Sequence, residues 1–383
     1  MRSLKRGAIM TSHVPASIGA FLEEVETPSL LLDLDAFERN LKRMADAVAG
    51  TAVRLRPHSK SHKCPTIALK QIEYGAVGVC CQKVSEAEAM VNGGVKDVYI
   101  SNEIVAHEKI QRLAALAKQA RIAIAVDHPD NVKVLSQTAL RLNVELSVLV
   151  EVNVGANRCG IDPGEQVISL VRQISGSGGL RFVGLQAYHG GAQHLLTYEE
   201  RKSAILSAVE KVKLTKQFLE QAGFSCEQVT GSGTGTYCFE LGSGVFTELQ
   251  AGSYVFMDVD YGRIQGKDGG LYRDFDHSLF VYTQVMSCPS SDHVVVDSGL
   301  KAFSTEKGVP LVYRMPEVQC RQVSDEHSVL KITNPERILK LGDKIRLIPP
   351  HCDPTVNLHD WYVGFRGKRV ETLWPITARG PGY

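Results

Sequence analysis

Along the first two thirds or so of the chain, short apolar runs alternate with longer segments whose apolar residues recur every three to four positions. Short apolar runs bounded by polar residues or glycine predict strands, and the longer spacing predicts helices. The predicted strands are 26–35, a run starting near residue 51, 76–82, 97–102, 122–127, 144–154, 182–188, 226–230 and 248–256. The predicted helices are 65–74, 85–91, 105–120, 129–142, 164–174 and 197–222.

Regular alternation of strands and helices with short connections predicts a parallel sheet. About eight such units closing on themselves form a (β/α)8 barrel, and a doubly wound open sheet is the alternative. Polar residues at the ends of successive predicted strands favour the barrel, because in a barrel those ends meet at one mouth. These residues are Lys60, Gln82, Asn102, Asp127, Arg158, His189 and 231–235.

The pattern changes after Tyr261. Residues 262–276 are polar and rich in glycine, which indicates a crossover between domains. From residue 278 onward, short β-type runs dominate without a strong helical period, so we expect a second, mostly β domain. The predicted runs are 279–286, 293–296, 329–332, 344–348, 362–365 and 370–374. We place the domains at 35–262 for the barrel, and at 20–34 plus 263–383 for the β domain.

Composition narrows the classes of function. The 383 residues carry a formal net charge of +1, so no global field attracts nucleic acid or an anionic membrane surface. No apolar run approaches the length needed to span a membrane. The nine cysteines form no metal-spaced pair, which is typical of reduced thiols in a cytoplasmic protein. Residues 1–12 hold three basic residues and no acid, a weak match to a leader sequence.

A basic cluster follows the strand that starts near residue 51. Lys60 lies among Arg56, His58 and His62. Neighbouring positive charge and burial both lower the pKa of an amine, which makes the amine a nucleophile able to form a Schiff base. The alternative is a solvated basic strand end, or one that pairs with phosphate or carboxylate.

Two glycine-containing turns follow late strands of the predicted barrel. They are 230–236 (TGSGTGT) and 251–254 (AGSY). Glycines let backbone amides approach an anion, and loops after late barrel strands often bind phosphate. A flexible loop is the alternative for 230–236, but two such turns after neighbouring strands favour a shared phosphate pocket. Arg158, at another strand end, could bind a ring nitrogen or a carboxylate, or form a surface ion pair.

Further candidate chemistry lies in two loops. His189, Gln193 and His194 follow the sixth strand, and a histidine there is a candidate general base or a hydrogen-bonded loop residue. His351 and Asp353 lie two apart at the end of an apolar strand, where alternation puts both side chains on one face. An imidazole and a carboxylate suit Mn²⁺, Mg²⁺ or Zn²⁺, and two protein ligands leave positions open for water and substrate. A polar turn between prolines is the alternative.

Taken together, these stretches resemble the D-threonine aldolase group of fold-type III pyridoxal-phosphate enzymes, which includes 3-hydroxy-D-aspartate aldolases. The resemblance covers nearly the whole chain, from about residue 27 to residue 380. It implies an alanine-racemase-like fold, in which a barrel is joined to a β domain. The matching motifs, in order, are TPSLLLDLDAFERN, RPHSKSHKCP, GVCCQKVSEAEA, ISNE, NRCG, QAYHGGAQH, GSGTG, ELQAGSYVFMD, DEH and HCDPTVNLHDW.

The resemblance also implies roles for individual residues. Lys60 would form the Schiff base with pyridoxal 5'-phosphate, and Lys63 would be a nearby cation. Arg158 would face the pyridine nitrogen, and His194 would be the base. His351 and Asp353 would bind the divalent metal, with Mn²⁺ or Mg²⁺ favoured over Zn²⁺. The implied cofactor contacts, besides Lys60 and Arg158, are Gln82, Tyr188, Thr230, Gly233, Thr234, Gly235, Gly252, Ser253 and Tyr254.

The implied activity is cleavage of D-β-hydroxy amino acids of the D-threonine type to glycine and an aldehyde. The C-terminal motif is also similar to that of 3-hydroxy-D-aspartate aldolases, which yield glyoxylate and glycine. Related dehydratases of D-serine or 3-hydroxy-D-aspartate use a His-x-Cys metal pair, and Asp353 at that position favours an aldolase. A cofactor carrier without turnover is a third possibility, against which the second domain and the His351/Asp353 pair argue. By analogy, the resemblance implies a homodimer.

Overall fold

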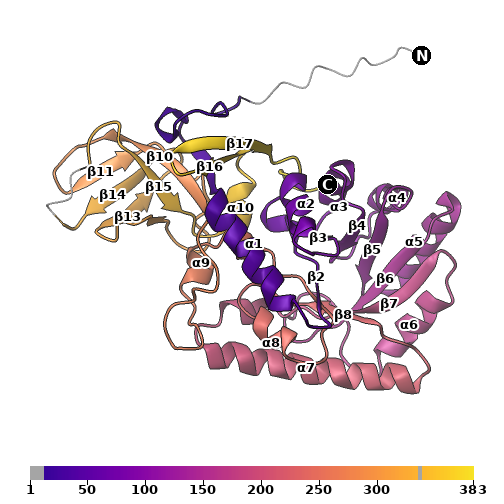
Figure 1. The fold of residues 1–383 in the computed structure, drawn as a ribbon. Helices are drawn as coiled ribbons and strands as arrows, with labels where there is room; N and C mark the ends of the chain where they lie inside the picture. Colours follow the sequence, from indigo (N-terminus) through magenta and orange to yellow (C-terminus); the bar gives the residue numbers. More distant parts are fainter. Residues whose placement is uncertain (1–12, 335–338) are drawn as a thin grey trace, which may run out of the picture.

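A computed structural model describes residues 13–334 and 339–383 of the chain. The leader suggested for residues 1–12 lies outside the described residues. Within them, a parallel barrel-like sheet with surrounding helices is joined to a mostly antiparallel β sheet (Figure 1). None of the described helices is long and apolar enough to cross a membrane.

The parallel sheet has eight strands in the order β2-β9-β8-β7-β6-β5-β4-β3. Its first and last strands meet, since the amide of Cys80 donates to the carbonyl of Pro57 (2.9 Å) and His58 pairs in parallel with Cys80. The predicted barrel is therefore confirmed over the open sheet. The strands are β2 (Arg54–Leu55), β3 (Val79–Cys81), β4 (Asp97–Ile100), β5 (Arg121–Val126), β6 (Leu146–Glu151), β7 (Leu180–Gln186), β8 (Gln228–Gly231) and β9 (Glu248–Leu249).

Helices connect these strands and cover the outside of the barrel. They are α2 (Pro65–Glu73), α3 (Val84–Asn92), α4 (His107–Leu116), α5 (Pro129–Leu142), α6 (Val167–Ser175), α7 (Tyr198–Gln221) and α8 (Tyr237–Leu241). Side chains alternate along each strand between the helical layer and the barrel interior. Cys81 packs in the helical layer while Cys80 packs with Tyr99 and Leu149 inside. All nine cysteines lie in the described part of the chain and are free thiols, as expected.

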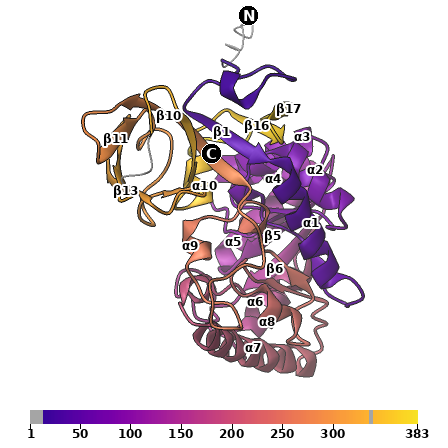
Figure 2. The same cartoon turned by 60° about the vertical axis from the view of Figure 1, so that its left-hand side comes forward.

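The second sheet contains nine strands within the described ranges, in the order β11-β14-β13-β12-β15-β10-β1-β16-β17. The N-terminal strand β1 lies inside this sheet between two neighbours, antiparallel to β10 and parallel to β16. The helix α1 (Leu34–Val48) then leads from this sheet to the barrel (Figure 2). The strands are β1 (Ser29–Asp33), β10 (Leu279–Ser287), β11 (His293–Val296), β12 (Leu311–Val312), β13 (Val318–Val323), β14 (Ser328–Ile332), β15 (Lys344–Ile348), β16 (Trp361–Arg366) and β17 (Arg369–Pro375).

One predicted strand end is wrong. The strand predicted over 248–256 ends at Leu249 because the chain turns at Gly252, where a Cβ would lie 2.7 Å from the carbonyl oxygen of His58. A 3-10 turn (Ser253–Val255) and the short helix α9 (Val259–Gly262) follow. In the β domain, Pro349 and Pro350 end β15, since proline cannot continue a strand ladder.

A short helix, α10 (Cys352–Val356), follows the two prolines. His351 is its N-cap residue and Asp353 lies in its first turn, so the two do not alternate along a strand as predicted. The helix α10 lies at the junction of the β sheet and the barrel in both views (Figures 1 and 2). The fold therefore carries His351 and Asp353 to the barrel mouth.

Candidate active site

A cavity of about 120 Å³ opens at the carboxyl ends of the barrel strands. Eight of the predicted site residues line it, from segments that follow six different strands. The fold therefore brings residues spread over nearly 200 positions of the chain to one place. These eight are Lys60, Gln82, Arg158, Tyr188, Gly233, Thr234, Gly252 and Ser253.

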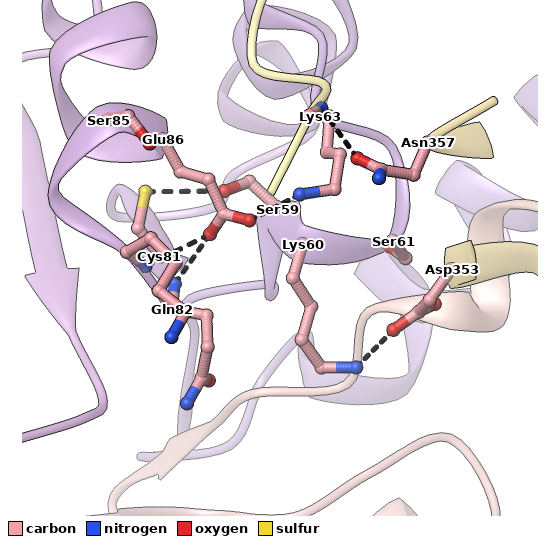
Figure 3. Close-up of polar contacts among 12 residues, drawn as sticks. Ser59, Lys60, Ser61, Lys63, Cys81, Gln82, Ser85, Glu86, Asp353 and Asn357 are labelled. Carbon is pink, nitrogen blue, oxygen red and sulfur yellow. Dashed lines mark hydrogen bonds and ion pairs between the residues drawn. The ribbon is translucent and has the colours of Figure 1, made fainter. Parts of the chain in front are cut away.

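Lys60 lies in a 3-10 turn (Ser59–Ser61) just after β2, and its Nζ donates to Oδ2 of Asp353 (Figure 3). Burial by itself lowers the pKa of Lys60, but the Asp353 carboxylate outweighs it and holds the pKa of this amine well above its usual range. The expectation of a lowered amine pKa is therefore wrong for the cofactor-free chain. The predicted alternative, pairing with a carboxylate, describes the observed contact.

The neighbouring bases do not act on Lys60 as expected. Burial, reinforced by the charge of Lys60, lowers the pKa of His58 to about 3, and burial lowers that of His62 to about 3 as well. Both imidazoles are therefore neutral at pH 7. The guanidinium of Arg56 donates to Glu248 (3.0 Å) and to Asp97 (2.6 Å), at the start of β4. Burial thus keeps His58 and His62 neutral, and two carboxylates pair with Arg56. The basic residues that are clustered in the sequence therefore do not act as one group of positive charges.

Lys63 points to a different partner. Its Nζ donates to Oε1 of Glu86 at 2.5 Å, and the pair is buried, with exposed side-chain fractions of 11% and 3%. The other carboxylate oxygen of Glu86 accepts from the amides of Gln82 (2.7 Å) and Lys83 (3.2 Å). Figure 3 shows Lys60 directed at Asp353 and Lys63 directed at Glu86. Lys60 is thus the lysine that reaches the cavity, whereas Lys63 ties the start of α3 to the barrel.

The turn after β8 presents one polar atom without a partner. Oγ1 of Thr234 is buried in the cavity wall and makes no hydrogen bond within the described residues. A phosphate oxygen would satisfy this hydroxyl, so the turn fits a phosphate group. Gly233 has a packing reason to be glycine, because a Cβ there would lie 2.4 Å from Oε1 of Gln193.

Three predicted cofactor contacts do not line this cavity. Thr230 is buried beneath it, where its hydroxyl donates to Glu248 at 3.1 Å. The amide of Gly235 donates to Oε1 of Gln193 at 3.1 Å. The ring of Tyr254 is 1% exposed, and its hydroxyl accepts from Gln71 at 3.2 Å. These three residues support the cavity walls and do not line its interior.

The other end of the cavity is formed by Arg158 and Tyr188, with the guanidinium carbon 5.9 Å from the centre of the tyrosine ring. The structure also places residues here that the sequence did not single out as site residues. Nε2 of His58 contacts Gln82 (3.2 Å) and Ser101 (3.1 Å). Ser101 directly follows β4, so its position at a strand end could have identified it as a site residue from the sequence. Ser232, from the predicted turn 230–236, also lines the cavity. The remaining unpredicted lining residues are Ser61, Gln186, Gln250 and Tyr261.

His194 lies outside this cavity, beyond the ring of Tyr261, with 6.0 Å between the ring centres. Its Nδ1 is 2.6 Å from Oδ2 of Asp260, a carboxylate that is 2% exposed. Burial raises the pKa of Asp260, but His194 and Arg263 outweigh burial and lower it to about 2. The ionised carboxylate beside Nδ1 favours the proton on that ring atom, which leaves Nε2 of His194 as the ring atom able to accept a proton.

The helix α9 connects His194 to the candidate metal pair. Asp260 on α9 contacts His194, and its amide donates to the carbonyl of Pro350 at 3.1 Å. Asp258, the N-cap residue of α9, accepts from the amide of Cys352 at 2.9 Å. The short helix α9 therefore fixes the imidazole of His194 relative to the segment that begins at His351.

His351 and Asp353 lie side by side, with 3.9 Å between Nε2 and Oδ1. One divalent ion with ligand bonds of about 2.0–2.2 Å could contact both atoms. Nδ1 of His351 contacts Glu306, which orients Nε2 toward Asp353. No third histidine, cysteine or acidic ligand completes a metal cluster within the described chain. The donor set fits a metal that keeps positions for water and substrate.

Comparison with known families places this arrangement in context. The model of the alanine racemase N-terminal domain matches residues 32–260. The model of a putative serine dehydratase domain matches residues 278–365. Together they cover the parallel sheet and most of the second sheet.

Curated relatives match almost the full length. A 3-hydroxy-D-aspartate aldolase of Paracoccus denitrificans (strain Pd 1222) is 45% identical over 97% of this chain and 96% of its own length. A D-threonine aldolase of an Arthrobacter species is 45% identical over 96% of each chain. A D-threo-3-hydroxyaspartate dehydratase of a Delftia species (strain HT23) is more distant, at 24% identity over 86% of this chain and 92% of its own.

Solved structures agree with this pattern. The crystal structure of D-threonine aldolase from Filomicrobium marinum superimposes with a TM-score of 0.93 at 45% identity, over 96% of this chain and 99% of that one. The D-threo-3-hydroxyaspartate dehydratase from Delftia sp. HT23 shares the fold, with a TM-score of 0.82 at 22% identity over 95% of this chain and 100% of that one.

Proposed function

Because this chain belongs to the alanine-racemase-like family of D-threonine and 3-hydroxy-D-aspartate aldolases, we propose that it is an aldehyde-lyase of the same kind. It cleaves a D-β-hydroxy amino acid into glycine and an aldehyde or a 2-oxo acid such as glyoxylate. It uses pyridoxal 5'-phosphate and a divalent metal, for which Mn²⁺ or Mg²⁺ is preferred and Zn²⁺ would also fit.

One observation carries this proposal. The lysine at the end of β2 contacts a carboxylate that lies beside an imidazole, so Lys60, His351 and Asp353 form one contiguous group. A lysine suited to hold the cofactor is thus in direct contact with a residue pair suited to hold a metal. A carrier without turnover has no need for the second half of this group.

The chain's residues divide the work. Thr234 and the turns around Gly233 and Gly252 would bind the phosphate, and Lys60 would hold the cofactor covalently. When bound, the cofactor supplies an electron sink for the charge left on Cα. His351 and Asp353 would hold the metal near the substrate's β-hydroxyl, where a divalent ion favours loss of the proton.

His194 then supplies the base. Nε2 is its free ring atom, and we propose that it takes the proton of the β-hydroxyl as the Cα–Cβ bond breaks. Loss of that proton and cleavage of the Cα–Cβ bond leave a carbonyl group on the departing fragment. The electron pair of the broken bond stays on Cα, which takes up a proton to give glycine, so that overall the hydroxyl proton is replaced by one on Cα. The base lies beyond Tyr261, so the β-hydroxyl of the substrate would face this side of the cavity.

A product assay tests the function. The purified chain is incubated with pyridoxal phosphate, Mn²⁺ and either D-threonine or 3-hydroxy-D-aspartate, with and without chelator. Glycine with acetaldehyde or glyoxylate supports the proposal. Ammonia with a 2-oxo acid in place of glycine would assign the chain to dehydration. Failure to cleave any D-β-hydroxy amino acid under these conditions would refute the aldolase.

Substitution of Thr234 by Val tests the phosphate cradle. The lost hydroxyl has no partner within the described residues, so we expect no loss of stability in the cofactor-free chain. Cofactor affinity should fall roughly 10- to 100-fold, because a hydrogen bond to a charged group contributes about 1.5–3 kcal/mol. Thermal unfolding of the cofactor-free chain and equilibrium binding of pyridoxal phosphate measure the two effects.

Thr236→Val is the matched control. The hydroxyl of Thr236 donates to Glu240 and accepts from Gln193, both at 2.8 Å. Its removal should therefore lower stability, the reverse of the expectation for Thr234. Equal cofactor affinity in Thr234→Val and the unmodified chain would contradict the cradle.

Replacement of Asp260 by Asn tests the positioning of His194. The amide cannot supply the negative charge that fixes the proton on Nδ1, so we expect kcat to fall roughly 10- to 100-fold with little change in KM. Asp260→Glu should recover part of the loss. Steady-state kinetics for the three proteins give the comparison, and an unchanged kcat in Asp260→Asn would show that this contact does not position the base.

We also propose a homodimer in the cytoplasm. Large apolar side chains remain exposed on segments that border the site: Val105 is 71% exposed, Leu196 is 53% and Leu358 is 41%. A second copy covering the mouth would bury them. The reduced cysteines support the compartment.

A further inference from the structure

A groove continues outward from the cavity, and Lys60 and Gln82 line both. The groove passes the candidate metal pair, His351 and Asp353, and ends against the C-terminal segment 380–382. A substrate with its amino group at Lys60 and its β-hydroxyl at the metal pair would direct its β-substituent into this groove. The groove walls therefore contact the part of the substrate that differs between D-threonine and 3-hydroxy-D-aspartate.

Every carboxylate of this groove already has a partner of its own. Glu86 pairs with Lys63, Asp353 pairs with Lys60, and Glu306 contacts His351. Lys83 also lines the groove, and no acidic group within the described residues pairs with it. Its ammonium is thus the uncompensated positive charge of the groove.

Lys83 is held in place along most of its length. It is the N-cap residue of α3, and its amide donates to Glu86 at 3.2 Å. The C-terminal segment lies on its methylene groups: at Gly382, which has a φ of +75°, a Cβ would lie 2.7 Å from Cγ of Lys83. The amide of Ser85 donates to the carbonyl of Tyr383 at 3.0 Å, which fixes this segment to α3. The Lys83 stem is therefore ordered before any substrate binds.

We propose that Lys83 binds a negatively charged β-substituent, so that a dicarboxylic substrate of the 3-hydroxy-D-aspartate class is preferred over D-threonine. This inference rests on the proposed aldolase function and selects its substrate. The β-carboxylate would meet the ammonium of a half-buried lysine that pairs with no acidic side chain within the described residues. The methyl group of D-threonine gains nothing from that ammonium and leaves it without a partner.

The expected preference can be expressed as a ratio of kcat/KM values for the two substrates. A hydrogen bond between charged groups contributes about 1.5–3 kcal/mol, which corresponds to roughly 10- to 100-fold in kcat/KM. Because the β-carboxylate is bound before and during cleavage, most of this factor should appear in KM.

The test compares kcat/KM for 3-hydroxy-D-aspartate and D-threonine in the unmodified holoenzyme, in Lys83→Gln and in Lys83→Arg. We expect the ratio of the two constants to fall roughly 10- to 100-fold in Lys83→Gln, through a higher KM for 3-hydroxy-D-aspartate. Lys83→Arg keeps the charge and should recover most of the ratio. Lys118→Gln, which removes an exposed lysine outside the groove, should leave the ratio unchanged.

Binding supplies a second measurement that needs no cleavage of the probe. Succinate is a four-carbon dicarboxylate that the enzyme cannot cleave, and we expect its inhibition constant against D-threonine cleavage to rise about tenfold in Lys83→Gln. A ratio that stays the same in Lys83→Gln would overturn the role of Lys83 while leaving the aldolase intact. So would an unmodified enzyme that cleaves only D-threonine. An unmodified enzyme that cleaves neither substrate would instead refute the proposed function.

Discussion

Replacement of Lys60 by Ala is expected to reduce cleavage by roughly a thousandfold or more and to abolish covalent attachment of pyridoxal phosphate. Lys60 is the lysine whose Nζ reaches the cavity and the candidate metal pair. Without this amine the cofactor is held by its phosphate contacts alone. Borohydride reduction followed by peptide mass mapping locates the attachment, and the product assay gives the rate.

Lys63→Arg is the matched control, since Lys63 is close in sequence and also basic. Arginine keeps the charge that pairs with the buried Glu86 but cannot form a Schiff base. We expect the cofactor to remain on residue 60 in this variant, with activity retained. Labelling that persists in Lys60→Ala and disappears in Lys63→Arg would exchange the roles of the two lysines.

Asp353→Asn is expected to lose most of the bound metal and roughly 10²–10⁴ in rate. The donor pair supplies only two protein ligands, so removal of the charged one leaves a single imidazole. A divalent ion near the β-hydroxyl contributes several kcal/mol to its deprotonation, and each 1.4 kcal/mol or so is a factor of ten. Elemental analysis of the dialysed protein measures the metal independently of the rate.

The metal prediction has its own controls. Treatment of the unmodified enzyme with a chelator should reproduce the loss in rate, and added Mn²⁺ should restore it. Asp360→Asn removes a half-exposed carboxylate that pairs with Arg379, and should keep both metal and activity. Full metal content together with full activity in Asp353→Asn would remove Asp353 from the proposed site.

The barrel could be predicted from the sequence because its strands are locally encoded. Strands of a parallel sheet covered by helices are buried on both faces and form continuous apolar runs. The strands β5 and β6, for example, are buried over most of their length. The prediction failed at 248–256, because the turn there depends on the close approach of Gly252 to His58, almost 200 residues away in the chain.

The candidate site was only partly accessible from the sequence. Strand-end position identified Lys60, Gln82 and Arg158, since carboxyl ends of barrel strands share one mouth. The sequence predicted that His351 and Asp353 lie side by side because they alternate along a strand. The two residues do lie side by side, but they do so at the start of a helix. Tyr261 gave no signal, since the short helix α9, which no sequence pattern predicted, carries it to the cavity.

The sequence by itself determined the order of strands and helices, the family, and the kinds of side chain available for chemistry. Only the tertiary structure decided which charged side chains pair with each other. Lys60 meets Asp353, 293 positions away, Lys63 meets Glu86, and Lys83 keeps no acidic partner within the described chain. The physical reason is that the state of an ionisable group depends on burial and on the nearest charges. In this fold, those charges come from distant parts of the chain.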